Sequence, residues 1–210
     1  MKQFETKHKQ NRKELAYWMR RLYQQGLTTC SGGNVSLRDG DFVYITASQT
    51  DKALIKAKQI CVLNLNGENF TPNLKPSMET GLHLEIYKSN LEIKAIIHAH
   101  PCNLSVLACA DIELKNDFTG EQRYLLGEIG EAPYFLMGSQ QLAMATANAC
   151  KNYNAVIMKN HGAICTGQTL FQAFDRMEVF EALAYQFIAF NPNLSAIKLT
   201  KEQIKEIDEF

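Results

Sequence analysis

The sequence has no excess of charge of either sign and no uninterrupted apolar run long enough to cross a membrane. Its 210 residues include 22 basic and 22 acidic side chains, so no global field draws the chain to nucleic acid or to an anionic membrane. The aromatic-rich stretch 179–190 contains Glu181 and Gln186 and is too short to span a bilayer. Residues 1–21 are rich in Lys, Arg and Gln and lack the apolar centre of a secretory signal. We therefore expect a soluble cytoplasmic protein with no nucleic-acid or membrane partner.

The six cysteines never occur with Cys-x-x-Cys spacing. Without an export signal, this absence favours free thiols in a reducing compartment over a disulfide framework. The chain also contains no internal repeat and no low-complexity linker. A length of 210 residues is enough to bury a sizeable core without disulfides, and we expect a single domain that spans residues 1–210.

Two histidines with one residue between them are the most informative feature that the sequence does contain. His98 and His100 end the apolar run that begins at residue 95, and a strand sends alternate side chains to one face, so both imidazoles aim at one point. His161 follows a second apolar run, 155–158. Three imidazoles with a fourth position open are typical of catalytic zinc, whereas closed structural sites more often use cysteine. The alternative is that His98 and His100 only pack on a sheet face.

The remaining pattern predicts helices and strands in alternation. Apolar residues at helical spacing or a capping hydroxyl indicate helices over 15–22, 77–88, 140–152, 169–190 and 201–210. Strands are expected over 35–38, 42–46, 60–65, 95–100 and 155–158. Adjacent β-segments early in the chain, followed by strands with flanking helices, favour an α+β or α/β sandwich around one mainly antiparallel sheet.

Three polar clusters lie beside these elements. The segment 31–36 combines glycines, which let backbone amides approach a ligand closely, with an Asn donor; this suits a phosphate, although a tight turn uses the same residues. The segment 46–50 is rich in hydroxyl groups, and its alternative is an ordinary solvated loop. The segment 76–79 places Ser77 at an expected helix start, where free amides favour an anion, although helix capping is the simpler role for Ser77.

The order and residue composition of these motifs resemble those of the class II aldolase and adducin-head family over essentially the whole chain. Five motifs carry the resemblance: residues 31–36, Ile45-Thr46-Ala47-Ser48, Lys75-Pro76-Ser77-Met78-Glu79, His98-Ala99-His100 and Asn160-His161-Gly162. The resemblance implies a three-layer α/β/α sandwich and a homotetramer with active sites between neighbouring subunits. It also implies a lyase that cleaves a phosphorylated ketose of the fuculose phosphate type by a retro-aldol reaction through a metal-stabilised enediolate.

The resemblance assigns roles to residues around the histidines. It implies that His98, His100 and His161 hold Zn²⁺ or another divalent metal, and that Glu79 is the catalytic acid and base. His83 lies four residues after Glu79 and therefore on the same helix face. We expect His83 to support the site or to pack in the core, and not to be a fourth imidazole ligand.

The resemblance also implies a cradle for the phosphate of a sugar substrate. The matching positions are Gly33, Asn34, Ser48 and Ser77. None of these loops carries an adjacent pair of Arg or Lys, so we expect neutral donors there. Gln49 and Met78 depart from the family pattern of a glycine and a second hydroxyl, which alters the cradle. No obvious tyrosine occupies the segment 119–121, where a neighbouring subunit would supply an acid, although Tyr124 is close by.

Several alternatives remain open. Methylthioribulose phosphate dehydratase belongs to the same family and also uses a three-histidine zinc site, and Asp51-Lys52 and His83 look like that enzyme. A sugar-phosphate epimerase fits the pattern around Glu79 less well. An adducin-like head would be a protein-interaction module, but such heads lack the metal histidines. A metal-dependent oxygenase with a His-x-His start would be a β-barrel, which the helix content fits poorly.

Overall fold

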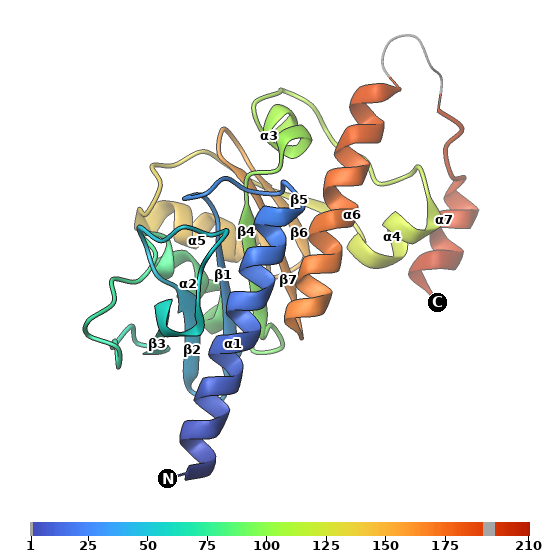
Figure 1. Ribbon diagram of the computed structural model, residues 1–210. Coiled ribbons are helices and arrows are strands. Elements are labelled where there is room, and N and C mark those ends of the chain that lie inside the picture. The colour runs from blue at the N-terminus through green and yellow to red at the C-terminus, as the bar shows by residue number, and fades with distance from the viewer. Residues whose placement is uncertain (1, 191–195) are drawn as a thin grey trace.

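The computed structural model describes residues 2–190 and 196–210, and its centre is a seven-stranded sheet (Figure 1). The strands lie in the spatial order β3-β2-β1-β4-β7-β6-β5. Their bounds are β1 Asn34–Asp39, β2 Phe42–Thr46, β3 Ile60–Asn64, β4 Ala95–Ala99, β5 Ile129–Ala132, β6 Ala155–Met158 and β7 Gly162–Gly167. Neighbouring strands are antiparallel except for β5 and β6, which are parallel. The mainly antiparallel sheet predicted from the sequence is confirmed.

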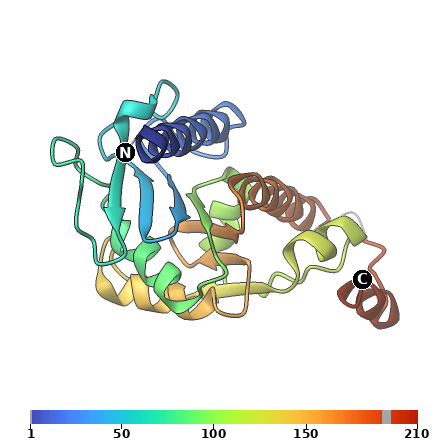
Figure 2. The same ribbon diagram turned by 90° about the horizontal axis from the view of Figure 1, so that it is seen from below.

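Helices cover both faces of this sheet (Figure 2). Their bounds are α1 Lys2–Gln24, the short 3-10 helix η1 Ala57–Gln59, α2 Thr80–Ser89, α3 Cys102–Ala108, α4 Gly120–Leu126, α5 Gln140–Ala149, α6 Leu170–Ala189 and α7 Lys201–Asp208. One layer contains α1 and α6, with α3 and α4 packed beside α6, and the opposite layer contains α2 and α5. The chain therefore forms the predicted three-layer α/β/α sandwich.

The core is divided between the two faces of the sheet because alternate strand residues point in opposite directions. Ile97 of β4 packs in the cluster that contains Met19 of α1 and Phe180 of α6. Ile96 packs in the cluster that contains Ile86 of α2. His98 lies two residues after Ile96 and so belongs to the α2 face of the sheet. This face carries the candidate site.

Side-chain caps fix where several helices begin. The Thr169 hydroxyl accepts a hydrogen bond from the Gln172 amide at the start of α6, and Thr200 caps α7 in the same way. Both helices begin within one residue of the predicted position. By contrast, α2 begins at Thr80, three residues later than predicted, and its N-cap residue is Glu79. Ser77 does not cap α2, because Pro76 is still extended and pairs with Ala47 in an isolated β-bridge.

Five elements are absent from the prediction: η1, α3, α4, β5 and β7. The central strand β7 is buried along its whole length, yet Gly162–Gly167 contains Ile164 as its single large apolar residue. Its small residues let α6 approach closely, since a Cβ on Gly167 would lie 2.9 Å from the Ala173 amide nitrogen. The helices α3 and α4 have seven residues each, which is too short for a clear apolar periodicity.

Two further expectations concern the whole chain. No helix within residues 2–190 and 196–210 has the length and apolar character needed to cross a membrane. All six cysteines are free thiols, as predicted. Three of them, Cys61, Cys150 and Cys165, are small buried residues, and the other three are exposed.

Candidate active site

Three histidines converge where β4 ends and β6 turns into β7. His98 is the fourth residue of β4, His100 follows that strand, and His161 lies in the β6–β7 turn. The turn is sharp because Asn160 adopts the left-handed conformation, with φ of 53°. One ring nitrogen from each histidine lies within 4.8 Å of the other two. The structure thus brings together the three residues that the sequence pattern singled out.

The hydrogen bonding of His98 leaves one ring nitrogen directed at this centre. His98 Nδ1 lies 3.0 Å from the carbonyl oxygen of Ala163. A carbonyl oxygen only accepts, so Nδ1 carries a proton, and Nε2 of the neutral ring presents its lone pair. Nε2 is buried and faces the Glu79 carboxylate. Metal-bound histidines are commonly oriented by such a bond on the second nitrogen.

Glu79 closes the fourth side of the histidine cluster. Its Oε2 lies 3.1 Å from His98 Nε2, and its Oε1 lies 3.1 Å from His161 Nε2. Burial raises the pKa of Glu79, but the charge of His98 and hydrogen bonds from His161, His98 and Asn34 outweigh burial and hold the pKa well below its usual value. Glu79 is therefore a carboxylate, and it is the one buried carboxylate in the described parts of the chain.

The electrostatics of this cluster suit a divalent cation. Burial lowers the pKa of His98, but the adjacent Glu79 carboxylate outweighs it and raises the pKa. A cavity that favours a proton between these groups also favours a metal ion there, which would displace that proton. Burial, followed by the charges of His98 and His161, lowers the pKa of His100 to about 4, so its ring is neutral, as a ligand must be. Three imidazoles and one carboxylate form a donor set that zinc and related metals accept.

The glycine loop before β1 packs directly against these histidines. Gly33 has φ of 64°, and a Cβ there would lie 2.8 Å from the His98 carbonyl oxygen. A Cβ on Gly32 would lie 3.2 Å from His100 Nδ1. These close approaches require glycine. The loop that the sequence predicts for phosphate binding is therefore adjacent to the histidine cluster.

Two more polar loops join this one. The Ser48 amide donates to the Lys75 carbonyl, and the Lys52 amide donates to the Cys30 carbonyl. The hydroxyls of Ser48 and Thr28 are buried without a hydrogen-bond partner. Gln49 has φ of 54°, a conformation that glycine adopts without steric cost.

Ser77 and Asn34, the other two predicted phosphate residues, have partners within the protein. The Ser77 hydroxyl accepts a hydrogen bond from the Glu79 amide, 3.3 Å away. Asn34 Nδ2 donates to Glu79 Oε2 over 2.8 Å. Asn34 Oδ1 contacts Nε2 of His83, whose ring is completely buried beneath α2. His83 thus contacts the site through Asn34 and is not part of the histidine cluster.

Lys52 is a charged residue that sequence reasoning did not assign to the site. It is only 2% exposed, and its Nζ donates to the Ala47 carbonyl and to the Thr50 hydroxyl, 3.1 Å from each. Within the described parts of the chain, no carboxylate lies within ion-pair distance of it. Burial lowers its pKa to about 8. Its place in the hydroxyl-rich loop was visible in the sequence, but its burial was not.

Comparisons with known proteins agree with this geometry. A model of the family described as "Class II Aldolase and Adducin N-terminal domain" matches residues 13–188. The chain belongs to this family. An L-fuculose phosphate aldolase from Methanocaldococcus jannaschii is 34% identical over 174 residues, which are 83% of this chain and 93% of that protein. A 3-oxo-tetronate 4-phosphate decarboxylase from Haemophilus influenzae is 31% identical over 194 residues, 90% of this chain and 91% of that one.

Solved structures of the class II aldolase and adducin family superpose closely on this chain. An L-fuculose 1-phosphate aldolase has a TM-score of 0.88 at 30% identity, covering 95% of both chains. YgbL from Klebsiella pneumoniae also has a TM-score of 0.88, at 29% identity, covering 95% of this chain and 98% of that one. The fold predicted from the sequence is confirmed, and so is its membership of the class II aldolase family.

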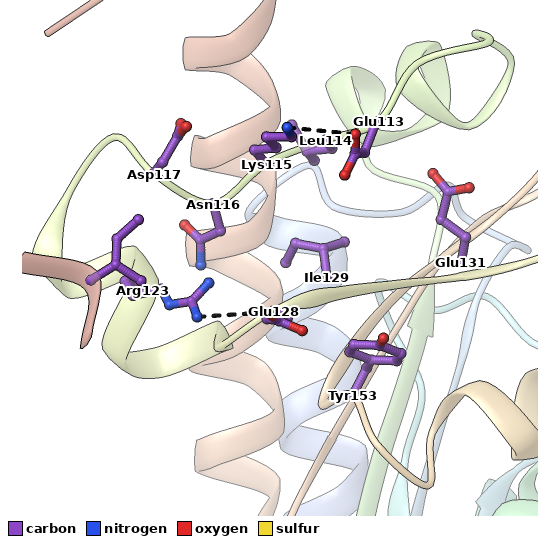
Figure 3. Close-up of a pocket in the computed structure, with 11 residues that line it drawn as sticks. Glu113, Leu114, Lys115, Asn116, Asp117, Arg123, Glu128, Ile129, Glu131 and Tyr153 are labelled. Carbon is purple, nitrogen blue, oxygen red and sulfur yellow. Dashed lines mark ion pairs between the residues drawn. The ribbon is translucent and has the colours of Figure 1, made fainter. Parts of the chain in front are cut away.

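A cavity of the class II aldolase domain is lined by none of the three histidines (Figure 3). This cavity of about 410 Å³ lies among residues 113–131, Tyr153 and Ile204. Two ion pairs join charged groups that line it, Lys115 with Glu113 and Arg123 with Glu128. Arg123 also pairs with Asp208, which lies outside the lining. Tyr124, considered above as an acid, does not line it and is exposed beside Phe210. Neither feature completes the histidine site of the same chain.

Proposed function

We propose that this protein is a divalent-metal-dependent lyase that cleaves a carbon–carbon bond in a phosphorylated sugar. Retro-aldol cleavage of a ketose 1-phosphate of the fuculose phosphate type is the reaction that we favour. The observation that carries the proposal is the contact of one buried carboxylate, Glu79, with both His98 and His161. This arrangement places a proton carrier beside a cation site, which is what carbanion chemistry next to a carbonyl requires.

The chemistry divides between the metal and the protein. Zn²⁺ is the metal that we propose, held by His98, His100 and His161, and when bound it offsets the negative charge that develops on the substrate oxygens. In a ketose 1-phosphate, the C4 hydroxyl loses its proton as the C3–C4 bond breaks, and the bonding electrons remain on C3. A proton must then be added to C3. We assign this transfer to Glu79, which the protein holds as a carboxylate next to the cation site. Glu79 accepts the proton that the C4 hydroxyl loses, directly or through solvent, and then donates it to C3.

The three joined loops are the proposed phosphate site. Gly33 offers backbone close to the histidines, Ser48 has a buried hydroxyl without a partner, and Ser77 lies one turn before α2. Asn34 keeps one amide hydrogen after its bond to Glu79. The ammonium of Lys52 adds a positive charge to these neutral donors. A buried charge without a partner is costly, and a phosphate dianion would supply that partner.

Decarboxylation of a sugar-acid phosphate is the second candidate, because the alignment with the Haemophilus influenzae decarboxylase covers 90% of this chain. The two reactions converge chemically. Loss of CO₂ from C1 of a 3-oxo-tetronate 4-phosphate leaves its bonding electrons on C2. Retro-aldol cleavage of fuculose 1-phosphate leaves them on C3. Both fragments become dihydroxyacetone phosphate on protonation, so one site with Glu79 as proton donor serves either reaction.

Product analysis tests the proposal and separates the alternatives. Metal-loaded protein is incubated separately with L-fuculose 1-phosphate, a 5-deoxypentulose 1-phosphate, 3-oxo-tetronate 4-phosphate and methylthioribulose phosphate. Dihydroxyacetone phosphate with an aldehyde supports the aldolase, and dihydroxyacetone phosphate with CO₂ supports the decarboxylase. A dehydrated product that keeps every carbon, from methylthioribulose phosphate, would instead establish the dehydratase. An absence of carbon–carbon cleavage with every substrate would contradict the proposal.

We further propose a cytoplasmic homotetramer with the site between subunits. An apolar surface beside the site supports this arrangement: Met78 is 67% exposed next to Glu79, and Leu136 and Met137 are also exposed. Met78 packs on Gly138, where a Cβ would lie 3.1 Å from its Cγ, so the two segments are contiguous. A neighbouring copy would cover these side chains. Three exposed free thiols suit a reducing compartment.

A further inference from the structure

A chain of buried hydrogen bonds runs from the catalytic carboxylate into the interface between α2 and the sheet. Glu79 Oε2 accepts from Asn34 Nδ2 over 2.8 Å, and Asn34 Oδ1 contacts His83 Nε2. His83 Nδ1 lies 2.6 Å from the hydroxyl of Ser36. That hydroxyl lies 2.7 Å from the hydroxyl of Tyr87. The three side chains beyond Asn34 are fully buried.

Only one direction of donation satisfies every link. The carboxylate of Glu79 accepts, so the amide nitrogen of Asn34 faces it, and the amide oxygen faces His83. His83 Nε2 must therefore carry a proton. Complete burial lowers the pKa of His83 to about 3, so the ring is neutral and Nδ1 accepts from Ser36. Because Ser36 has one proton to give, Tyr87 donates to Ser36 over 2.7 Å, and the Lys94 carbonyl, 3.3 Å from the Tyr87 hydroxyl, is a second and more distant acceptor for the same proton.

We propose that His83 is a positioning residue, which holds the Asn34 amide in the orientation that donates to Glu79. This inference rests on the proposed role of Glu79. If the amide of Asn34 were turned over, its oxygen would face the Glu79 carboxylate, and the two acceptors would repel each other. An Asn side chain by itself has little preference between the two orientations, since its oxygen and nitrogen have nearly the same shape. The Nε2–H group of His83 removes this ambiguity.

A purely structural role for His83 would be to satisfy polar atoms beneath α2. The two roles require different things of position 83. Positioning needs a donor at the place of Nε2, whereas filling the interface needs volume and a partner for Ser36. In the His83→Gln variant, the longer side chain can place an amide donor near Asn34. In the matched His83→Asn variant, the shorter side chain can contact Ser36 but cannot reach Asn34.

The positioning role of His83 is tested by kinetics combined with NMR of the histidine rings. For the positioning role, kcat in His83→Asn is expected to fall by about ten- to a hundredfold with KM nearly unchanged, because one hydrogen bond to the acid and base is lost. His83→Gln is expected to stay within about threefold of the parent, as the donor is retained. Equal losses in the two variants, or a parent-like kcat in His83→Asn, would overturn the proposal.

The NMR measurement needs no substrate and therefore separates this proposal from the proposed function. In the metal-free parent protein with ¹⁵N-labelled histidine, the ring signals that disappear in His83→Gln are expected to show a protonated Nε2 and a bare Nδ1. The slowed exchange of the Asn34 side-chain amide is expected to be lost in His83→Asn. A protonated Nδ1 on His83 would refute the proposed direction. If His83→Asn did not fold, Tyr87→Phe, which removes the last donor of the chain, would be tested in its place for faster Asn34 amide exchange.

Discussion

Asn34 and His98 reach the same oxygen of Glu79. Asn34 Nδ2 donates to Oε2 over 2.8 Å, and His98 Nε2 lies 3.1 Å from that oxygen. The two residues lie opposite each other in the pairing of β1 with β4, so one strand pair positions both. Glu79, at the start of α2, is therefore held by the sheet beneath it.

The histidine cluster is expected to bind about one divalent ion per chain, as three-histidine sites do. Replacement of both His98 and His100 by Ala should abolish metal binding while circular dichroism shows a folded chain. His8→Ala is the matched control, because His8 packs against Phe42 outside the cluster, and it should keep the metal. Elemental analysis after dialysis measures the content. Unchanged metal in the double variant would refute the ligand assignment.

Glu79→Gln keeps the shape of the side chain but removes its ability to accept a proton. Turnover is expected to fall by about two to four orders of magnitude with substrate binding largely kept. Glu85→Gln is the control on the same helix, since Glu85 pairs with Lys88 at the surface, and it should retain the parent rate. Steady-state kinetics with the substrate that the product analysis identifies makes the comparison. A parent-like rate for Glu79→Gln would require another acid and base.

Lys52→Met should weaken binding of a phosphorylated substrate by about one to two orders of magnitude, the usual value of a hydrogen bond to a charged group. A dephosphorylated sugar should be unaffected. Because the pKa of Lys52 is about 8, the ammonium loses its proton as the pH rises through this value, so phosphate affinity of the parent should decline above pH 8. Exposed Lys75→Met is the control. Competition by inorganic phosphate measures the effect, and equal affinities in the two variants would show that Lys52 only supports its loop.

Stability at acid pH should depend on His83. Its pKa is lowered by burial from 6.5 to about 3, so between these values the unfolded chain binds a proton that the folded chain does not. The free energy of unfolding should therefore fall as the pH falls, by about 1.4 kcal/mol per pH unit from this residue. Urea unfolding of the metal-free parent and of His83→Gln, from pH 6.5 to 4.5, tests this. Parallel curves would mean that His83 is protonated in the folded protein.

The histidine cluster could be predicted from the sequence because local rules place its residues. His98 and His100 follow from strand alternation, and His161 follows from a short strand with a turn. Their convergence needs only that β4 and β6 both flank β7, which the order of strands provides. The sandwich was predicted from the succession of strands and flanking helices, and its three layers from the resemblance to the family.

The residues that the sequence did not reveal depend on tertiary packing. Lys52 follows the hydroxyl-rich loop in the sequence, where a solvated side chain is the ordinary expectation. It is buried because three loops from different parts of the chain pack together. Tyr87 lies on the same helix as His83. Its hydroxyl contacts that of Ser36 because α2 packs against β1. The start of α2 was misplaced because Pro76 pairs with Ala47 of a distant segment, which no local capping rule includes.

Proton exchange on dihydroxyacetone phosphate reports on the metal site and Glu79 together. This compound is the fragment common to both candidate reactions, so the measurement needs no knowledge of the second product. Metal-loaded protein is incubated with this compound in D₂O, and the hydroxymethyl protons are followed by NMR. The parent is expected to exchange one of them for deuterium stereospecifically, whereas chelator-treated protein and Glu79→Gln should exchange at the background rate. No exchange by the metal-loaded parent, or equal exchange by Glu79→Gln, would contradict the account of a metal site with Glu79 as its proton carrier.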